Sequence, residues 1–246
     1  MDRMLYVAMT GARETLRAQT ANNHNLANAS TTGFRADLQA FQARHVAGDG
    51  YHSRVYATVG NTGFDATQGT LIPTGRDLDV AVQGAGYLAV LGLDGREAYS
   101  RAGDLHVDPN GQLMTGTGLQ VLGDGGPIAV PPYSSLKLGD DGTVSIVPLG
   151  QGPETRADIA RIKLVRPLDT DLEKGVDGML RMKDGSDAPV DATVRIASGV
   201  LESSNVNVAD ALVNMIELQR RFDMQVRAMK SAEDNGAASA RLLSLR

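Results

Sequence analysis

The residues best suited to metal or acid–base chemistry are few and poorly spaced for it. The chain has four histidines, and the nearest pair, His45 and His52, lies in a glycine-containing stretch without the His-Glu-x-x-His spacing of a zinc helix. His24 and His106 are isolated in the sequence. The absence of cysteine excludes disulfides, thiolate zinc sites, iron–sulfur clusters and a cysteine nucleophile. We therefore expect no metal site.

Nucleotide and hydrolase motifs are also missing. Gly84-Ala-Gly86 begins like a dinucleotide fingerprint but lacks the third glycine, and a strand-like run follows it. The turn sequences at 108–111 and 140–143 lack the further oxygen ligands and the final glutamate of an EF-hand. No Gly-x-Ser-x-Gly or Walker motif occurs. These observations predict no catalytic residue, no cofactor and no enzymatic activity.

A cluster of amide side chains is more distinctive. Asn22, Asn23, Asn25 and Asn28 crowd the end of an apolar N-terminal pattern, just before a Ser-Thr-Thr-Gly sequence. One interpretation is ordinary helix-ending chemistry, in which short polar side chains satisfy free backbone groups. The other is a helix–helix seam, where buried amides fix the register at some cost in stability. The second interpretation favours a defined assembly.

A helix–helix seam lined by these amides requires a helix at each end of the chain. Residues 1–32 and 200–246 each hold one glycine and no proline, and apolar or amide residues recur there at three- and four-residue steps. The N-terminal stripe is Leu5, Met9, Ala12, Leu16, Gln19, Asn23 and Leu26, and the C-terminal stripe is Leu212, Met215, Gln219, Phe222, Val226 and Met229. Asn205 or Asn207 is the expected cap of the second helix.

The middle of the chain has a different pattern. It holds 26 of the 28 glycines and all nine prolines, with Asp-Gly and Asn-Gly pairs between short apolar runs. The strand-like runs are 78–82, 87–90, 128–130, 144–147, 159–165 and 194–201. No helix-length segment separates them, so we predict a mostly antiparallel β module rather than a doubly wound sheet. The predicted fold class is α+β, with segments 1–32 (helical), 33–75 (connecting), 76–202 (β module) and 203–246 (helical).

Charge and hydropathy narrow the possible partners. The net charge of −5 and the isoelectric point near 5.4 argue against a nucleic-acid-binding surface. No apolar run reaches the roughly 18 residues that a spanning helix needs. The first residues lack the basic region and long apolar run of a secretory signal, so we expect no ordinary cleaved signal. We expect proteins as partners, with no small-molecule substrate.

The predicted C-terminal helix is too long for a domain of this size to cover. At roughly 1.5 Å per residue, its thirty or so residues extend about 45 Å. One apolar stripe does not offset the ordering of so many residues, so we expect both ends to be poorly ordered in a monomer and to become helical when subunits pack.

Several segments resemble a known family. Asn25-Leu-Ala-Asn28 with Ser30-Thr-Thr-Gly-Phe-Arg35, and Leu201-Glu-Ser-Ser-Asn-Val-Asn-Val208 with 215–222, are similar to the terminal signatures of bacterial flagellar rod and hook proteins. Thr74–Val80, Tyr99–Asp104 and 121–132 resemble the proximal-rod members of that family. His24 departs from the signature, which usually has asparagine there. The resemblance covers nearly the whole chain.

The resemblance implies a structural subunit of the basal-body rod that crosses the periplasm. Its terminal helices would polymerise into the drive shaft and the wall of the export channel. The implied partners are inner-proximal and distal rod proteins, copies of itself and the export apparatus, which would export it without a cleaved signal peptide. A distal-rod subunit is the main alternative, and a secreted protein-binding adaptor is a weaker one.

The residues expected to carry assembly follow from the two stripes and the two signatures. They are Leu5, Met9, Leu16, Asn23, Asn25, Leu26, Asn28, Gly33, Phe34, Asn205, Asn207, Leu212, Met215, Ile216, Gln219, Phe222, Val226 and Met229.

Overall fold

The chain forms two compact units. The computed structural model describes residues 3–45, 55–152, 154–175 and 177–244. The terminal unit contains the described parts of 1–27, 37–63 and 206–246, and the central unit contains those of 28–36 and 64–205. Helices lie at both ends and antiparallel strands in between, so the predicted α+β class is confirmed. The four-segment division of the chain stays a prediction.

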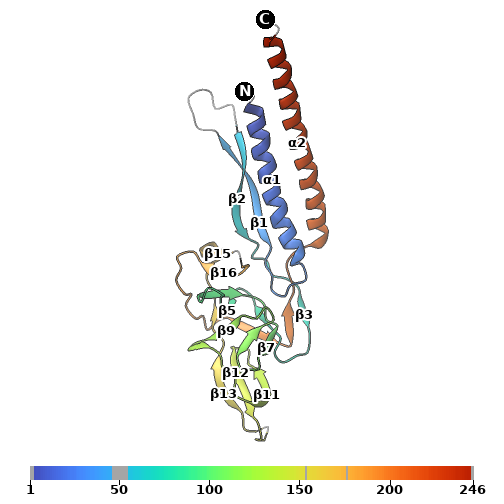
Figure 1. The fold of residues 1–246 in the computed structure, drawn as a ribbon. Helices are drawn as coiled ribbons and strands as arrows, with labels where there is room; N and C mark the ends of the chain where they lie inside the picture. The colour runs from blue at the N-terminus through green and yellow to red at the C-terminus, as the bar shows by residue number, and fades with distance from the viewer. Residues whose placement is uncertain (1–2, 46–54, 153, 176, 245–246) are drawn as a thin grey trace. The chain divides into compact units, whose positions relative to one another are not determined.

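The terminal unit consists of two helices and a strand pair. Helix α1 spans Arg3–Ala27 and helix α2 spans Val208–Ser244, and the two lie side by side with both chain ends at the same end of the pair (Figure 1). Strands β1 (Asp37–His45) and β2 (Val55–Phe64) form a two-stranded sheet, and β1 contacts α1. Helix α2 continues past the start of α1 (Figure 1).

Local sequence explains where α2 begins. The Asn207 side-chain oxygen accepts a hydrogen bond from the amide of Ala209 at 3.0 Å, and Asp210 follows in the first turn. Of the two predicted caps, Asn207 is therefore the one used. Asn205 instead binds backbone groups of the central unit: its side chain accepts from Ala36 N and donates to the carbonyls of Asp65 and Thr67.

The central unit is built from short antiparallel strands. The largest sheet has the order β15-β16-β6-β5-β9-β8-β7, with β10 paired to β9 and β14 paired to β5. Its strands are β5 (Tyr87–Leu91), β6 (Glu97–Ser100), β7 (Leu105–Val107), β8 (Leu113–Thr115), β9 (Gln120–Gly123), β10 (Gly126–Pro127), β14 (Leu164–Val165), β15 (Leu172–Lys174) and β16 (Leu180–Met182). A short 3-10 helix, Asp169–Asp171, precedes β15.

Three smaller sheets complete this unit. They are β11-β12-β13 (Tyr133–Leu138, Thr143–Pro148, Ala157–Arg161), β17-β4 (Arg195–Ser198, Val80–Gln83) and β18-β3 (Val200–Glu202, Leu71–Pro73). The pairs β17-β4 and β18-β3 join the last strands before α2 to strands from the first third of the chain. Val80, Leu88, Leu105, Val121 and Ile196 are completely buried in the main core.

Three predicted strands differ from the observed ones. The run 159–165 divides between β13 and β14, which lie in different sheets, and Ile162 between them bridges Gly123. The run 194–201 divides at Gly199, whose φ of 76° is not an extended conformation. The run 128–130 forms no named strand, and Ala129 makes only an isolated bridge to Gln112.

Candidate assembly surface on the terminal helices

The residues buried on α1 and α2 are mostly small, although Glu14 and Leu218 are buried as well. Ala8, Ala12 and Ala18 are buried on α1, as are Ala211 and Ala232 on α2. Small residues let two helix axes approach closely, because the interaxial distance depends on the side chains between them.

Gly11 and Asn22 show how close this approach is. A Cβ atom on Gly11 would lie 3.0 Å from Gln225 Cδ, so the Gln225 side chain covers this glycine. The Asn22 amide donates to the carbonyl of Ala211 at 2.8 Å. Asn22 thereby fixes the register between the end of α1 and the start of α2.

Large apolar side chains of both helices remain exposed. Leu5, Met9 and Leu16 are 37–51% exposed on α1, and Ile216 is 55% exposed on α2. A surface of this kind on one chain is typical of a site that another protein covers.

The predicted stripes lie beside the α1–α2 contact rather than at its centre. On α1, Leu5, Met9, Leu16 and Asn23 are exposed and Leu26 is half-buried. On α2, Leu212, Ile216, Gln219 and Val226 are exposed, whereas Met215, Phe222 and Met229 are half-buried. One edge of each stripe thus faces the chain's own helix pair and the other faces outward.

Two of the remaining amides of the N-terminal cluster, Asn25 and Asn28, bind the chain that follows α1. The Asn25 side chain donates to Asp37 O at 3.0 Å and accepts from Asp37 N at 2.8 Å, as a neighbouring strand would. His24 Nδ1 lies 2.6 Å from Asp37 Oδ2. Asn28 accepts from the Thr31 hydroxyl at 3.1 Å. These contacts hold the start of β1 against α1 and close the turn after it.

A buried charge cluster in the central unit joins the segments that lead into the two helices. Arg35 Nη2 lies 2.7 Å from Glu202 Oε1, and Arg101 Nη1 lies 2.9 Å from Glu202 Oε2. All three side chains are at most 3% exposed. Glu202 Oε1 also accepts from Gly69 N at 3.0 Å. Burial lowers the pKa of Arg35, and the Glu202 carboxylate opposes this shift.

Gly33 and Phe34 pack into this cluster, which we call the Glu202 clasp (Arg35, Arg101 and Glu202). Gly33 has a φ of +66°, and a Cβ there would lie 2.1 Å from the carbonyl carbon of Arg101, so only glycine fits. Its amide donates to Glu202 O at 2.8 Å. Phe34 is buried, and Lys174 Nζ lies 4.0 Å from its ring centre.

The clasp could not be recognised as a unit from the sequence. Its members are 66 and 101 residues apart, and no spacing rule relates them. The available signal was that Arg35, Arg101 and Glu202 each fall inside a segment that carried the family resemblance. Charged residues within otherwise apolar or small-residue motifs are candidates for buried ion pairs.

The described residues offer little for metal or membrane chemistry. Within them, no three histidine, aspartate or glutamate side chains gather as a metal site would require. Among the same residues, neither helix is long and apolar enough to cross a membrane. His52 and the side chain of His45 lie outside the described part of the chain.

Comparison with known proteins identifies the chain's relatives. Residues 81–146 match the model of the flagellar hook protein FlgE/F/G D1 domain, and residues 197–242 match that of the flagellar basal body rod FlgEFG protein C-terminal region. The flagellar basal-body rod proteins FlgF of Escherichia coli and Salmonella typhimurium are 43% and 41% identical, each over the full length of both chains. FlgG of Bacillus subtilis is 31% identical over 95% of this chain and 96% of its own length.

These matches place the chain among the flagellar rod and hook proteins, which are structural proteins. Within this class, the chain belongs to the FlgF family of flagellar basal-body rod proteins. The predicted resemblance is confirmed, and the FlgG alternative is not favoured, because the FlgF relatives named above match at higher identity.

Proposed function

We propose that this chain is a subunit of the proximal rod that polymerises through α1 and α2 to form the drive shaft and the wall of the export channel. The observation that carries the proposal is the exposed apolar surface on both terminal helices, with Met9 and Ile216 both more than half exposed. Other copies that covered this surface would supply the burial that one chain lacks.

The helix pair also suits the transmission of torque. Its intrachain contact is close and its register is fixed by Asn22, so the pair can move as one body. The Glu202 clasp joins two segments of the chain, Gly33–Arg35 and Leu201–Glu202. The first segment follows α1, and the second precedes α2. The clasp thus fixes to each other the two chain segments that connect to the helices.

This function implies a location and a set of partners. The subunit would lie in the rod as it crosses the periplasm, between inner-proximal and distal rod proteins. It would pass through the export apparatus without a cleaved signal peptide and would turn over no substrate. The assembly residues proposed for these contacts are those of the two stripes and the two signatures given above.

A proline substitution tests the role of α2. Met215→Pro places proline inside α2, where it removes a backbone hydrogen bond and costs about 3 kcal/mol or more. In cells lacking their own copy, this variant should fold its central unit but fail to enter basal bodies and fail to restore motility.

Val208→Pro is the matched control, because Val208 is the first helical residue, where proline is well accepted. It should restore motility. Normal rods assembled from Met215→Pro would contradict the proposed role of α2. Deletion of 1–32 or of 205–246 with motility retained would contradict the proposal as a whole.

A further inference from the structure

The two terminal helices expose different and complementary stripes. On α1, Leu5, Met9, Arg13 and Leu16 follow one another at steps of four, four and three residues, which places them on one face. All four are exposed, and the Arg13 side chain is 64% exposed. We call this face the α1 stripe.

The α1 stripe is basic. The Arg17 side chain, at its edge, is 58% exposed. The acidic residue between the two arginines, Glu14, is only 1% exposed and contacts both of them. The surface presented to a partner is therefore apolar with positive charge.

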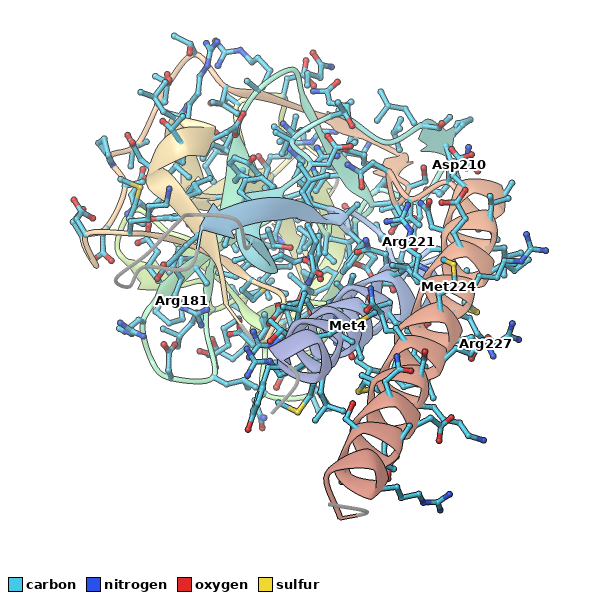
Figure 2. The ribbon with its side chains drawn as sticks, turned by 90° about the horizontal axis from the view of Figure 1, so that it is seen from above. Met4, Arg181, Asp210, Arg221, Met224 and Arg227 are labelled. Atoms are coloured by element: carbon cyan, nitrogen blue, oxygen red, sulfur yellow. The ribbon has the colours of Figure 1, made fainter. Side chains whose placement is uncertain are left out.

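On α2, the outward stripe contains Asp210, Val213, Glu217 and Met224, at steps of three, four and seven residues. All four are exposed. Figure 2 labels Asp210 near the start of α2 and Met224 further along the helix. The face that contacts α1 is different, since it carries Ala211 and Gln225. The α2 stripe combines apolar side chains with two carboxylates.

We propose that the α1 stripe of one copy docks antiparallel on the α2 stripe of a second copy, an inference that rests on the proposed function. Leu5 and Leu16 are eleven residues apart, and so are Val213 and Met224. Aligning Leu16 with Val213 and Leu5 with Met224 brings Arg13 level with Ile216, one residue from Glu217, so the Arg13 guanidinium can reach the Glu217 carboxylate.

Charge disfavours a parallel docking of the two stripes. A parallel alignment of the same apolar residues, Leu5 with Val213 and Leu16 with Met224, brings Arg13 level with Arg221 and next to Arg220. The positive charges of these arginines would repel one another across the contact. Glu217 and Arg221, 3.5 Å apart, form an exposed pair, which exchanges partners at little cost. Arg13 contacts the buried Glu14, which keeps its contact with Arg17 when Arg13 turns to Glu217.

The difference between the α1 stripe and the α2 stripe determines the kind of assembly. The two stripes differ, so each copy offers one of each and the contact is head-to-tail. Such contacts build rings or open helical polymers rather than closed dimers. A second copy of this chain is thus the partner that fits both surfaces at once.

Cysteine cross-linking tests the docking, because the natural chain contains no cysteine. Two singly substituted chains, Arg13→Cys and Glu217→Cys, are coexpressed in cells lacking the natural copy, and their basal bodies are purified and oxidised. Since each chain carries one cysteine, a disulfide between the two variants can form only between subunits. The disulfide requires Cα atoms within about 7 Å, so it reports register as well as contact.

Asp223→Cys is the matched control for Glu217→Cys. Asp223 is exposed and acidic like Glu217, but it lies on another side of α2. We expect at least about tenfold more mixed dimer from Arg13→Cys with Glu217→Cys than from Arg13→Cys with Asp223→Cys. Equal yields, or a higher yield from the control pair, would overturn the docking.

The outcome separates this inference from the proposed function. If the cells swim and their basal bodies contain both variants without the mixed dimer, the docking is wrong and the rod function stands. If the natural chain itself is missing from basal bodies, both proposals fail. If Arg13→Cys alone prevents incorporation, Arg13→Glu combined with Glu217→Arg decides: restored incorporation supports the pairing, and continued failure overturns it.

Discussion

The core of the central unit is built from large side chains such as Leu88, Leu105 and Ile196, none of which is measurably exposed. The α1–α2 contact of the terminal unit buries mainly alanine, glycine and threonine, while Met9 and Ile216 remain about half exposed. The central unit thus completes its core within one chain. The terminal helices leave several large apolar side chains exposed, although Leu218 is buried and Phe222 is half-buried.

The largest expected effect is at the Glu202 clasp. Glu202→Gln keeps the size of the side chain but leaves Arg35 and Arg101 buried without a carboxylate, which should cost about 3–5 kcal/mol of unfolding free energy. Urea unfolding followed by circular dichroism measures the loss. Glu217→Gln, at an exposed pair with Arg221, should change stability by less than about 1 kcal/mol. Similar losses in both variants would contradict the role of the clasp.

Truncation of apolar side chains compares the two units directly. Leu88→Ala should destabilise the central unit by about 2–5 kcal/mol, because it empties space in a closed core. Met9→Ala should change the stability of the free chain by only about 0.5 kcal/mol yet reduce incorporation into basal bodies. Thermal unfolding and basal-body composition are the two measurements. A large stability loss from Met9→Ala would show that the free chain already buries this residue.

The cap of α2 should have a smaller effect. Asn207→Ala removes the acceptor for the amide of Ala209 and should cost about 1 kcal/mol of helix stability, seen as lower helix content by far-UV circular dichroism. Asn214→Ala, at an exposed position inside the same helix, should leave the helix unchanged or slightly stabilised. Equal helix loss in the two variants would remove Asn207 as the cap.

Acid should affect the central unit through its turn aspartates, with the smallest effect per residue. Hydrogen bonds from Arg181 lower the pKa of Asp177, and those from Arg96 lower the pKa of Asp94 to about 2. A lowered pKa in the folded state gives stability that is present above the unfolded value of about 3.9 and is lost as the pH falls through the folded value.

Asp177→Asn tests this dependence. The variant should be less stable than the natural chain at neutral pH, and the difference should narrow as the pH falls below about 4. Urea unfolding at a series of pH values measures it. A difference that stays constant down to the lowest pH would contradict the assigned hydrogen bond.

Local chemistry in the sequence was enough to predict much of the fold. The scarcity of glycine and the absence of proline near both ends of the chain predicted the two terminal helices. Short polar residues before α2 predicted its cap, which is Asn207. Asp-Gly and Asn-Gly pairs predicted the turns of the β module, and Gly111 and Gly142 have the positive φ that such turns need. Each of these features depends on neighbours within a few residues.

Features that depend on distant neighbours could not be predicted in the same way. Periodicity located the apolar stripes, but the small side chains that determine the intrachain contact, such as Ala8 and Ala18, carry a weak hydropathy signal. The run 159–165 reads as one strand, because nothing local shows that its halves pair with β12 and β5. The Glu202 clasp requires three segments that are far apart in the sequence to be in place before its ion pairs can form.

The Glu202 clasp also sets an order of events for a chain made from its N-terminus. Arg35 and Arg101 are synthesised long before Glu202, so an incomplete chain carries two guanidinium groups that have no counter-charge to enter the interior with. The partners of β3 and β4, which are β18 and β17, arrive equally late. The clasp and these two strand pairs therefore cannot form until about four fifths of the chain has been synthesised.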